Sequence, residues 1–172
     1  MLARDGASFE LAQRLALGQA TLGEVMAFLS GLYFRGKRTY ASAFGNPPPA
    51  CEGAWVITPA AGLVRLESPL SRAQLAAFGE VPIRLDEPRY LEPLLATSYE
   101  LARCLGRAEV VLLDSLATPK YTAPLGDVFG RRLRFPTCFV GRGDMSRGSV
   151  LLKAARTQLE LEYSPVSELV VA

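Results

Sequence analysis

The sequence predicts an α/β protein in which helices flank a small, mostly parallel sheet, with a helical region in front of it. Apolar residues at helical spacing alternate with short apolar runs along residues 54–165, the pattern of strand–helix–strand units. Residues 1–46 show helical spacing alone. The 172 residues, 49% of them hydrophobic, suit one domain of ordinary size. We therefore expect a single domain over residues 1–172, with residues 1–46 packed on it as a helical N-terminal segment.

The N-terminal region is expected to contain at least two helices. Residues 8–17 place apolar side chains on one face. Thr21 and Glu24 then stand at the spacing of a capping box, in which each side chain accepts a hydrogen bond from a backbone N–H of the other residue. The helix that begins there either continues to Phe44 or gives way to a second helix. Three prolines at 47–49 cannot continue it.

The later elements are predicted from apolar runs and from glycines that close helices. The run at residues 54–57 is typical of a strand buried on both faces. The other expected strands cover residues 109–113 and 133–135, with a candidate edge strand at 159–163. The expected helices cover residues 72–78, 93–105, 122–130 and 145–155.

Charge and histidine content exclude several classes of function. The chain has 19 Lys and Arg against 17 Asp and Glu, so its surface as a whole is not a polyanion-binding field. It has no histidine, which excludes a Ser-His-Asp triad, a Cys-His dyad and any histidine-ligated metal within this chain. Neither a phosphate-binding Walker loop nor a dinucleotide fingerprint is present. We expect no metal and no cofactor.

The cysteine pattern favours a cytoplasmic protein. Cys51, Cys104 and Cys138 are an odd number of cysteines without a C-x-x-C motif, so neither a disulfide nor a zinc site is expected. Polar residues interrupt any apolar signal core near the N-terminus. The longest aliphatic run, residues 110–113, is far shorter than the roughly 20 residues that cross a bilayer. We expect no membrane partner.

The densest polar cluster lies at residues 140–149, where a loop enters a predicted helix. Glycines let a backbone approach a ligand, the first N–H groups of a helix attract anions, and arginine offers paired donors to phosphate. The alternative is a glycine-rich loop in which Asp144 or Ser146 caps the helix and the arginines are solvated. The expected ligand-binding residues are Arg142, Gly143, Asp144, Ser146 and Arg147.

A second polar cluster, residues 114–121, directly follows the expected strand at 109–113. Ligands of open α/β sheets bind beyond the carboxyl ends of strands, where hydroxyls, a lysine and a tyrosine would serve a phosphate or a base. The alternative is a turn at Asp114 followed by a helix start at Pro119. The expected ligand-binding residues are Ser115, Thr118, Lys120 and Tyr121.

A third cluster, residues 33–40, interleaves basic and aromatic side chains. Such a mixture suits a groove that stacks bases and pairs phosphates. The alternative is a helix end with solvated charges that favour the helix dipole and half-buried tyrosines. The expected nucleic-acid contacts are Arg35, Lys37, Arg38 and Tyr40.

Several stretches resemble known families. The sequences LYFRGK at 32–37 and FVGRGDMSRG at 139–148, with residues 116–121, resemble a family of uncharacterised bacterial proteins, which implies no particular reaction. Residues 54–114, with a strand that ends in Thr58-Pro59, are similar to the α/β domain shared by oxidative-stress DNA-binding proteins and by the middle part of archaeal tRNA-modifying enzymes. That likeness implies a nucleotide-type ligand.

Together these observations favour a protein that binds a phosphate-bearing ligand, either a nucleotide or a nucleic-acid segment, between the loops at 115–121 and 141–149. Whether the ligand is also processed is left open, because no spacing among Asp114, Asp127 and Asp144 singles out a catalytic pair. The alternative is a non-catalytic protein-interaction or scaffold module, in which the glycines serve turns.

Overall fold

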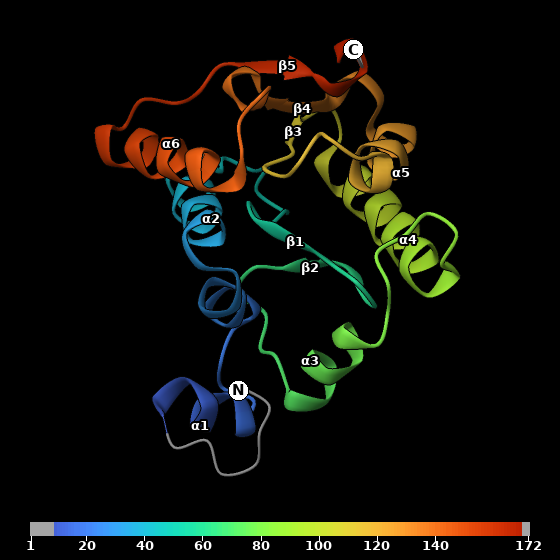
Figure 1. The fold of residues 1–172 in the computed structure, drawn as a ribbon. Helices are drawn as coiled ribbons and strands as arrows, with labels where there is room; N and C mark the ends of the chain where they lie inside the picture. Colours follow the sequence, from blue (N-terminus) through green and yellow to red (C-terminus); the bar gives the residue numbers. More distant parts are fainter. Residues whose placement is uncertain (1–8, 170–172) are drawn as a thin grey trace.

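In the computed structural model, which describes residues 9–169, helices surround two small sheets (Figure 1). The expected mixed α/β class is confirmed. The helices are α1 (Glu10–Ala16), α2 (Leu22–Phe44), α3 (Arg72–Gly79), α4 (Pro88–Leu105), α5 (Pro119–Phe129) and α6 (Asp144–Thr157). The strands are β1 (Trp55–Thr58), β2 (Gly62–Arg65), β3 (Val110–Val111), β4 (Leu133–Pro136) and β5 (Tyr163–Pro165). Short 3₁₀ helices cover Gly130–Arg132, Thr137–Phe139 and Val166–Glu168.

The expectation of a mostly parallel sheet is wrong. β1 pairs antiparallel with β2, which the sequence did not predict as a strand, and the two form a separate hairpin. β3 pairs parallel with β4, and β4 pairs antiparallel with β5. The cause is a tight turn that ends at Gly62, which has a φ of +65° and lies so close to α4 that an added Cβ would overlap the Pro93 carbonyl. The chain therefore turns back directly after β1, and β2 becomes the neighbour of β1. Along β1, buried residues alternate with half-buried ones.

α2 begins with the predicted capping box and is divided by a kink. The Thr21 hydroxyl accepts from the Glu24 backbone N–H at 3.3 Å, and the Glu24 carboxylate accepts from the Thr21 N–H at 2.8 Å. Gly31, with a φ of +64°, breaks the helical backbone. Apolar residues before the kink pack with those of α1, while the part after it lies along α6 (Figure 1).

Two glycines let α2 and α6 approach each other until their backbones touch. A Cβ added at Gly36 would lie 2.8 Å from the Gly148 carbonyl oxygen, and one added at Gly148 would lie 2.9 Å from the Tyr33 Cα. Both distances are shorter than van der Waals contact, so neither position accepts a larger side chain without moving a helix. This packing fixes the second half of α2 against the start of α6.

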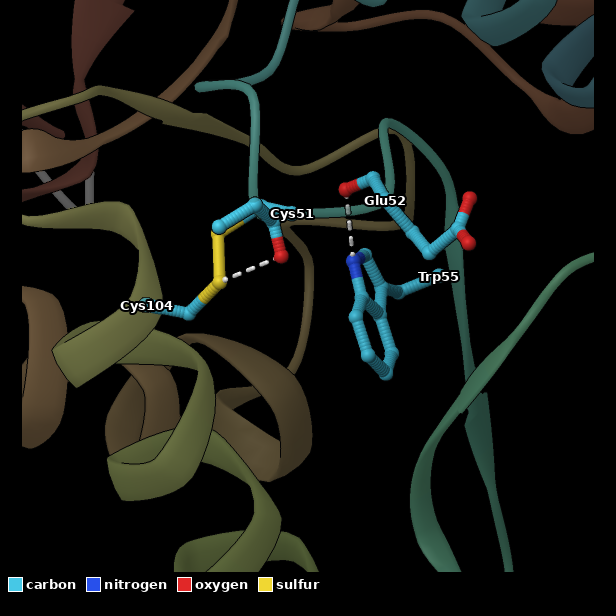
Figure 2. Close-up of a disulfide and its surroundings, with 5 residues drawn as sticks. Cys51, Glu52, Trp55 and Cys104 are labelled. Carbon is cyan, nitrogen blue, oxygen red and sulfur yellow. Dashed lines mark hydrogen bonds between the residues drawn. A yellow bond between two sulfur atoms is a disulfide. The ribbon is translucent and has the colours of Figure 1, made fainter.

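The prediction that the chain forms no disulfide is wrong. Cys51, which precedes β1, is bonded to Cys104 in the last turn of α4 (Figure 2). Their Cα atoms lie 6.1 Å apart although 53 residues separate them in sequence, because α4 packs on the β1–β2 hairpin. The spacing of the cysteines along the sequence does not indicate that α4 packs on this hairpin. Cys138 is free and half-buried.

Other boundaries differ by a few residues from expectation. α4 begins at Pro88 rather than 93, because the Glu87 carboxylate accepts from the Arg89 N–H at 3.2 Å and caps an earlier start. α5 likewise begins at Pro119, and β3 has two residues instead of five. The predicted start of the first helix, residue 8, lies outside the described residues, as do the residues before it that were compared with a signal leader. The polar residues that interrupt a signal core, Glu10, Gln13 and Arg14, lie in α1. Within residues 9–169, no helix combines the length and apolar character needed to cross a membrane.

Candidate functional site

A cleft of about 850 Å³ runs between the second half of α2, the segment 46–57 and the residues around β3. Sites for small molecules commonly have volumes of roughly 300–1,000 Å³. Much of the lining is aromatic or aliphatic and comes from β1, α4 and α5, with Trp55, Leu101 and Leu125 among it. Both predicted loops reach the cleft: Tyr121 belongs to one and Asp144 to the other.

The most strongly paired charges in the cleft are Lys37 and Asp114. The Lys37 ammonium lies 2.6 Å from the Asp114 Oδ2, with 17% and 27% of the two side chains exposed. The same ammonium lies 4.2 Å from the ring centroid of Tyr33. Asp114 is held in turn by the Ser115 backbone N–H, which donates to its Oδ1 at 2.7 Å. Lys37 is thus fixed on α2, facing the end of the β3 segment.

Tyr33 connects this ion pair to α6. Its hydroxyl donates to the Leu113 carbonyl at 3.3 Å. Burial and the negative charge of Asp114 raise the pKa of Tyr33, while the positive charge of Arg147 opposes the shift. Burial and the charge of Asp114 also raise the pKa of Tyr121 to about 12. Both phenols are therefore neutral hydrogen-bond donors at neutral pH.

Arg147 is a buried cation whose guanidinium has Tyr33, Asp144 and Phe139 as neighbours. Only 7% of the residue is exposed, and its guanidinium lies 5.7 Å from the Phe139 ring centroid. Its Nη1 lies 3.4 Å from the Asp144 Oδ1, but that carboxylate is 68% exposed. The Arg147 Nε is buried and has no hydrogen-bond partner among the described residues. We call Tyr33, Lys37, Asp114, Asp144 and Arg147 the polar cluster.

No side chain among residues 9–169 caps the start of α6. Gly143 occupies the N-cap position, so neither Asp144 nor Ser146 caps the helix as the alternative interpretation of this loop expected. Ser146 instead accepts a hydrogen bond from the exposed Arg142 at 3.0 Å. The first N–H groups of α6 therefore stay available for an anion, beside two arginines.

Whole-chain comparisons with family models, curated proteins and solved structures give no match. The resemblances carried by the sequence motifs stay predictions, and the interpretation of the site rests on its geometry.

The loop at 114–121 contributes less than the sequence predicts. The Ser115 hydroxyl accepts from the Ala117 N–H at 3.3 Å and closes a turn. Thr118 is the exposed N-cap of α5 and makes no side-chain cap bond. The Lys120 ammonium lies 5.0 Å from the Tyr121 ring centroid. Turn formation and helix initiation thus account for most of this loop, while Tyr121 faces the cleft.

The basic and aromatic residues of α2 do not form one open surface. Lys37 is paired with Asp114, and Arg38 lies 3.4 Å from the Glu67 carboxylate. Tyr40 is 2% exposed, and its hydroxyl lies 2.5 Å from that of Tyr163, so it is not placed to stack a base. Arg35 is exposed. The helix distributes these side chains around its circumference, so the expected nucleic-acid contacts separate.

The cleft lining carries more negative than positive charge. Among the described residues, five carboxylates and two cations line it: Glu52, Glu109, Asp114, Asp144 and Glu160 against Lys37 and Arg38. Sequence reasoning singled out Lys37 and Asp114 in separate clusters, but nothing in the sequence joins two residues that lie 77 positions apart.

Proposed function

We propose that this protein binds a small ligand with a single phosphate group, of the nucleoside monophosphate class, with the phosphate at the start of α6 and the remainder in the cleft. The main support for the proposal is the burial of the Arg147 guanidinium. A guanidinium keeps its charge when buried, and the nearest carboxylate to it, on Asp144, is largely solvated. An anion beside Asp144 and Tyr33 would complete the neutralisation of that charge.

The start of α6 supplies the donors. Its first backbone N–H groups have no side-chain cap, and they carry the positive end of the helix dipole. Arg142 and Ser146 lie alongside and add a paired donor and a hydroxyl. These groups match the oxygens of one phosphate.

The charge of the lining favours one phosphate over several. Three phosphates, or the repeating phosphates of a nucleic acid, would be repelled by the five carboxylates of the lining. The amino groups of a nucleobase can instead donate to those carboxylates, and Tyr121 and Trp55 offer aromatic faces for its ring. A nucleotide is therefore a better fit than the nucleic-acid segment that the sequence also allows.

A thermal-unfolding screen tests the proposal. Adenosine, guanosine, cytidine and uridine monophosphates are compared with their triphosphates and with inorganic phosphate. A monophosphate present at 100 times its Kd should stabilise the chain by about 2.7 kcal/mol, which raises the Tm of a chain of this size by roughly 5–10 °C.

Two exposed arginines provide a matched pair of variants for the same screen. Arg142→Ala removes a donor at the start of α6, whereas Arg35→Ala removes an exposed arginine of α2. Arg142→Ala should weaken binding about tenfold and Arg35→Ala should not. Equal affinities of the two variants, or no shift with any monophosphate, would contradict the proposal.

The alternative, a non-catalytic interaction module, has one observation in its favour. Phe28 and Leu29 of α2 are half exposed, and Phe28 stacks on Phe9 with ring centroids 5.4 Å apart. A screen without any Tm shift would favour this alternative.

A cytoplasmic location also remains part of the proposal, although the disulfide removes the argument from cysteine spacing that supported it.

A further inference from the structure

We propose that the disulfide between Cys51 and Cys104 is a redox clamp on one wall of the cleft: reduction releases the segment 46–53 from α4 and opens the site. We call this segment, with its link to Cys104, the disulfide wall. The proposal rests on the proposed function only for its effect on ligand affinity, because movement of the wall can be measured without a ligand.

The disulfide connects two parts of the cleft lining. On one side, the segment 46–53 and the adjoining Trp55 contribute to the lining, and on the other side so do Leu101 and Leu105 of α4. Cys51 lies in the segment and Cys104 in α4, and neither cysteine itself lines the cleft. The bond joins the segment directly to α4 and therefore sets the separation of these two elements (Figure 2).

In the part of the chain that the structure describes, few other polar contacts connect this segment to α4. The Cys51 N–H donates to Pro48 within the segment at 2.9 Å, and the Trp55 indole donates to the nearby Glu52 carbonyl at 3.0 Å. The Cys104 sulfur also lies 3.4 Å from the Ala50 carbonyl oxygen. Cys51 and Trp55 also pack against the apolar cluster that includes Leu101 and Leu105 of α4. Without the covalent bond, mainly these apolar contacts would hold the segment to α4, and it could open while its own turn persists.

The bond is accessible to a reductant. Cys104 is exposed and Cys51 is half-buried. One thiolate of a dithiol reductant attacks the Cys104 sulfur, and Cys51 leaves as a thiolate and takes up a proton. The second thiol of the reductant then displaces Cys104, which takes up a proton in turn. Two electrons pass to the protein, and the reductant becomes a disulfide.

Trp55 reports the wall directly, since it is the single tryptophan of the chain and lies close to Cys51 (Figure 2). Solvent access to the indole is measured by the bimolecular quenching constant of acrylamide, which is the Stern–Volmer constant divided by the fluorescence lifetime. The intensity and the lifetime themselves also respond to quenching by the disulfide. Dithiothreitol should raise the quenching constant about twofold or more. A Cys51→Ala/Cys104→Ala variant should show the raised value without reductant, and Cys138→Ala should behave as the unmodified chain.

Ligand affinity supplies the second measurement. A fixed wall reduces the ordering that binding costs, so reduction should raise the Kd for adenosine monophosphate about fivefold or more. If adenosine monophosphate and the other monophosphates bind neither the oxidised nor the reduced chain, the proposed function is wrong. The Trp55 measurement still tests whether reduction releases the disulfide wall. Unchanged quenching on reduction overturns the clamp. Loss of the helical circular dichroism also overturns it, because the bond would then be required for folding.

Discussion

All residues of the polar cluster except the buried Arg147 line the same cleft as the disulfide wall, but the two regions are held in place by different means. The polar cluster depends on backbone contact between α2 and α6 and on a short ion pair between segments distant in sequence. The disulfide wall depends on one covalent bond that closes a loop of 53 residues, a cross-link that the chain-entropy model values at about 4 kcal/mol. The packing that holds the polar cluster does not depend on the redox potential, whereas a reductant can release the disulfide wall.

The largest expected effect comes from forcing the two helices of the polar cluster apart. Gly148→Ala places a Cβ 2.9 Å from the Tyr33 Cα, whereas Gly126→Ala in α5 places one in open space. Alanine improves helix propensity by about 1 kcal/mol at both positions. Gly126→Ala should therefore stabilise the chain by about 1 kcal/mol, while overpacking makes Gly148→Ala destabilising by about 2 kcal/mol.

Urea unfolding measures both values. Equal stabilities of the two variants would mean that α2 and α6 can separate at little cost. The contrast between a rigid polar cluster and a releasable disulfide wall would then disappear.

A smaller effect is expected from the ion pair of the polar cluster. A double-mutant cycle with Lys37→Met and Asp114→Asn should give a coupling energy of about 1–2 kcal/mol, because the pair is largely shielded from water. The exposed pair of Arg84 and Asp86 is a matched control, with side chains 65% and 73% exposed, and should give less than about 0.5 kcal/mol. Equal coupling energies would show that Lys37 and Asp114 contribute no more to the cluster than a surface contact does.

The sequence predicted best those features that depend on neighbours along the chain. The capping box at Thr21 and the helices with long apolar faces are of this kind, since spacing of three or four residues determines them. The sheet was mispredicted because β1 could pair with any later strand, and the choice of β2 depends on the turn at Gly62 and on its fit against α4.

The site shows the same division. The residues of the polar cluster were identified in two loops and one helix, but their meeting depends on contacts between segments far apart in sequence. The Cys51 and Cys104 bond could not be predicted for the same reason. The missing cap at Asp144 has a local cause: the chain enters α6 one residue earlier than the capping geometry of that side chain requires.

The smallest effect is expected at the start of α2, where Thr21 and Glu24 lie before the Gly31 kink and do not line the cleft. The hydrogen bond from Arg14, and then the one from the Thr21 N–H, lower the pKa of Glu24 to about 2. Since the pKa of this carboxyl is lower in the folded chain than in the unfolded chain, its stabilisation is complete above about pH 5 and is lost as the pH falls towards 2.

Glu24→Gln removes the charge, so this variant should be less stable than the unmodified chain by about 1 kcal/mol at pH 7 and equally stable near pH 2. Urea unfolding across this range measures the difference. A difference that is independent of pH would contradict the role of the charge. An altered affinity of Glu24→Gln for adenosine monophosphate at pH 7 would mean that the kink does not isolate the start of α2 from the polar cluster. The rigid part of the site would then include the capping box.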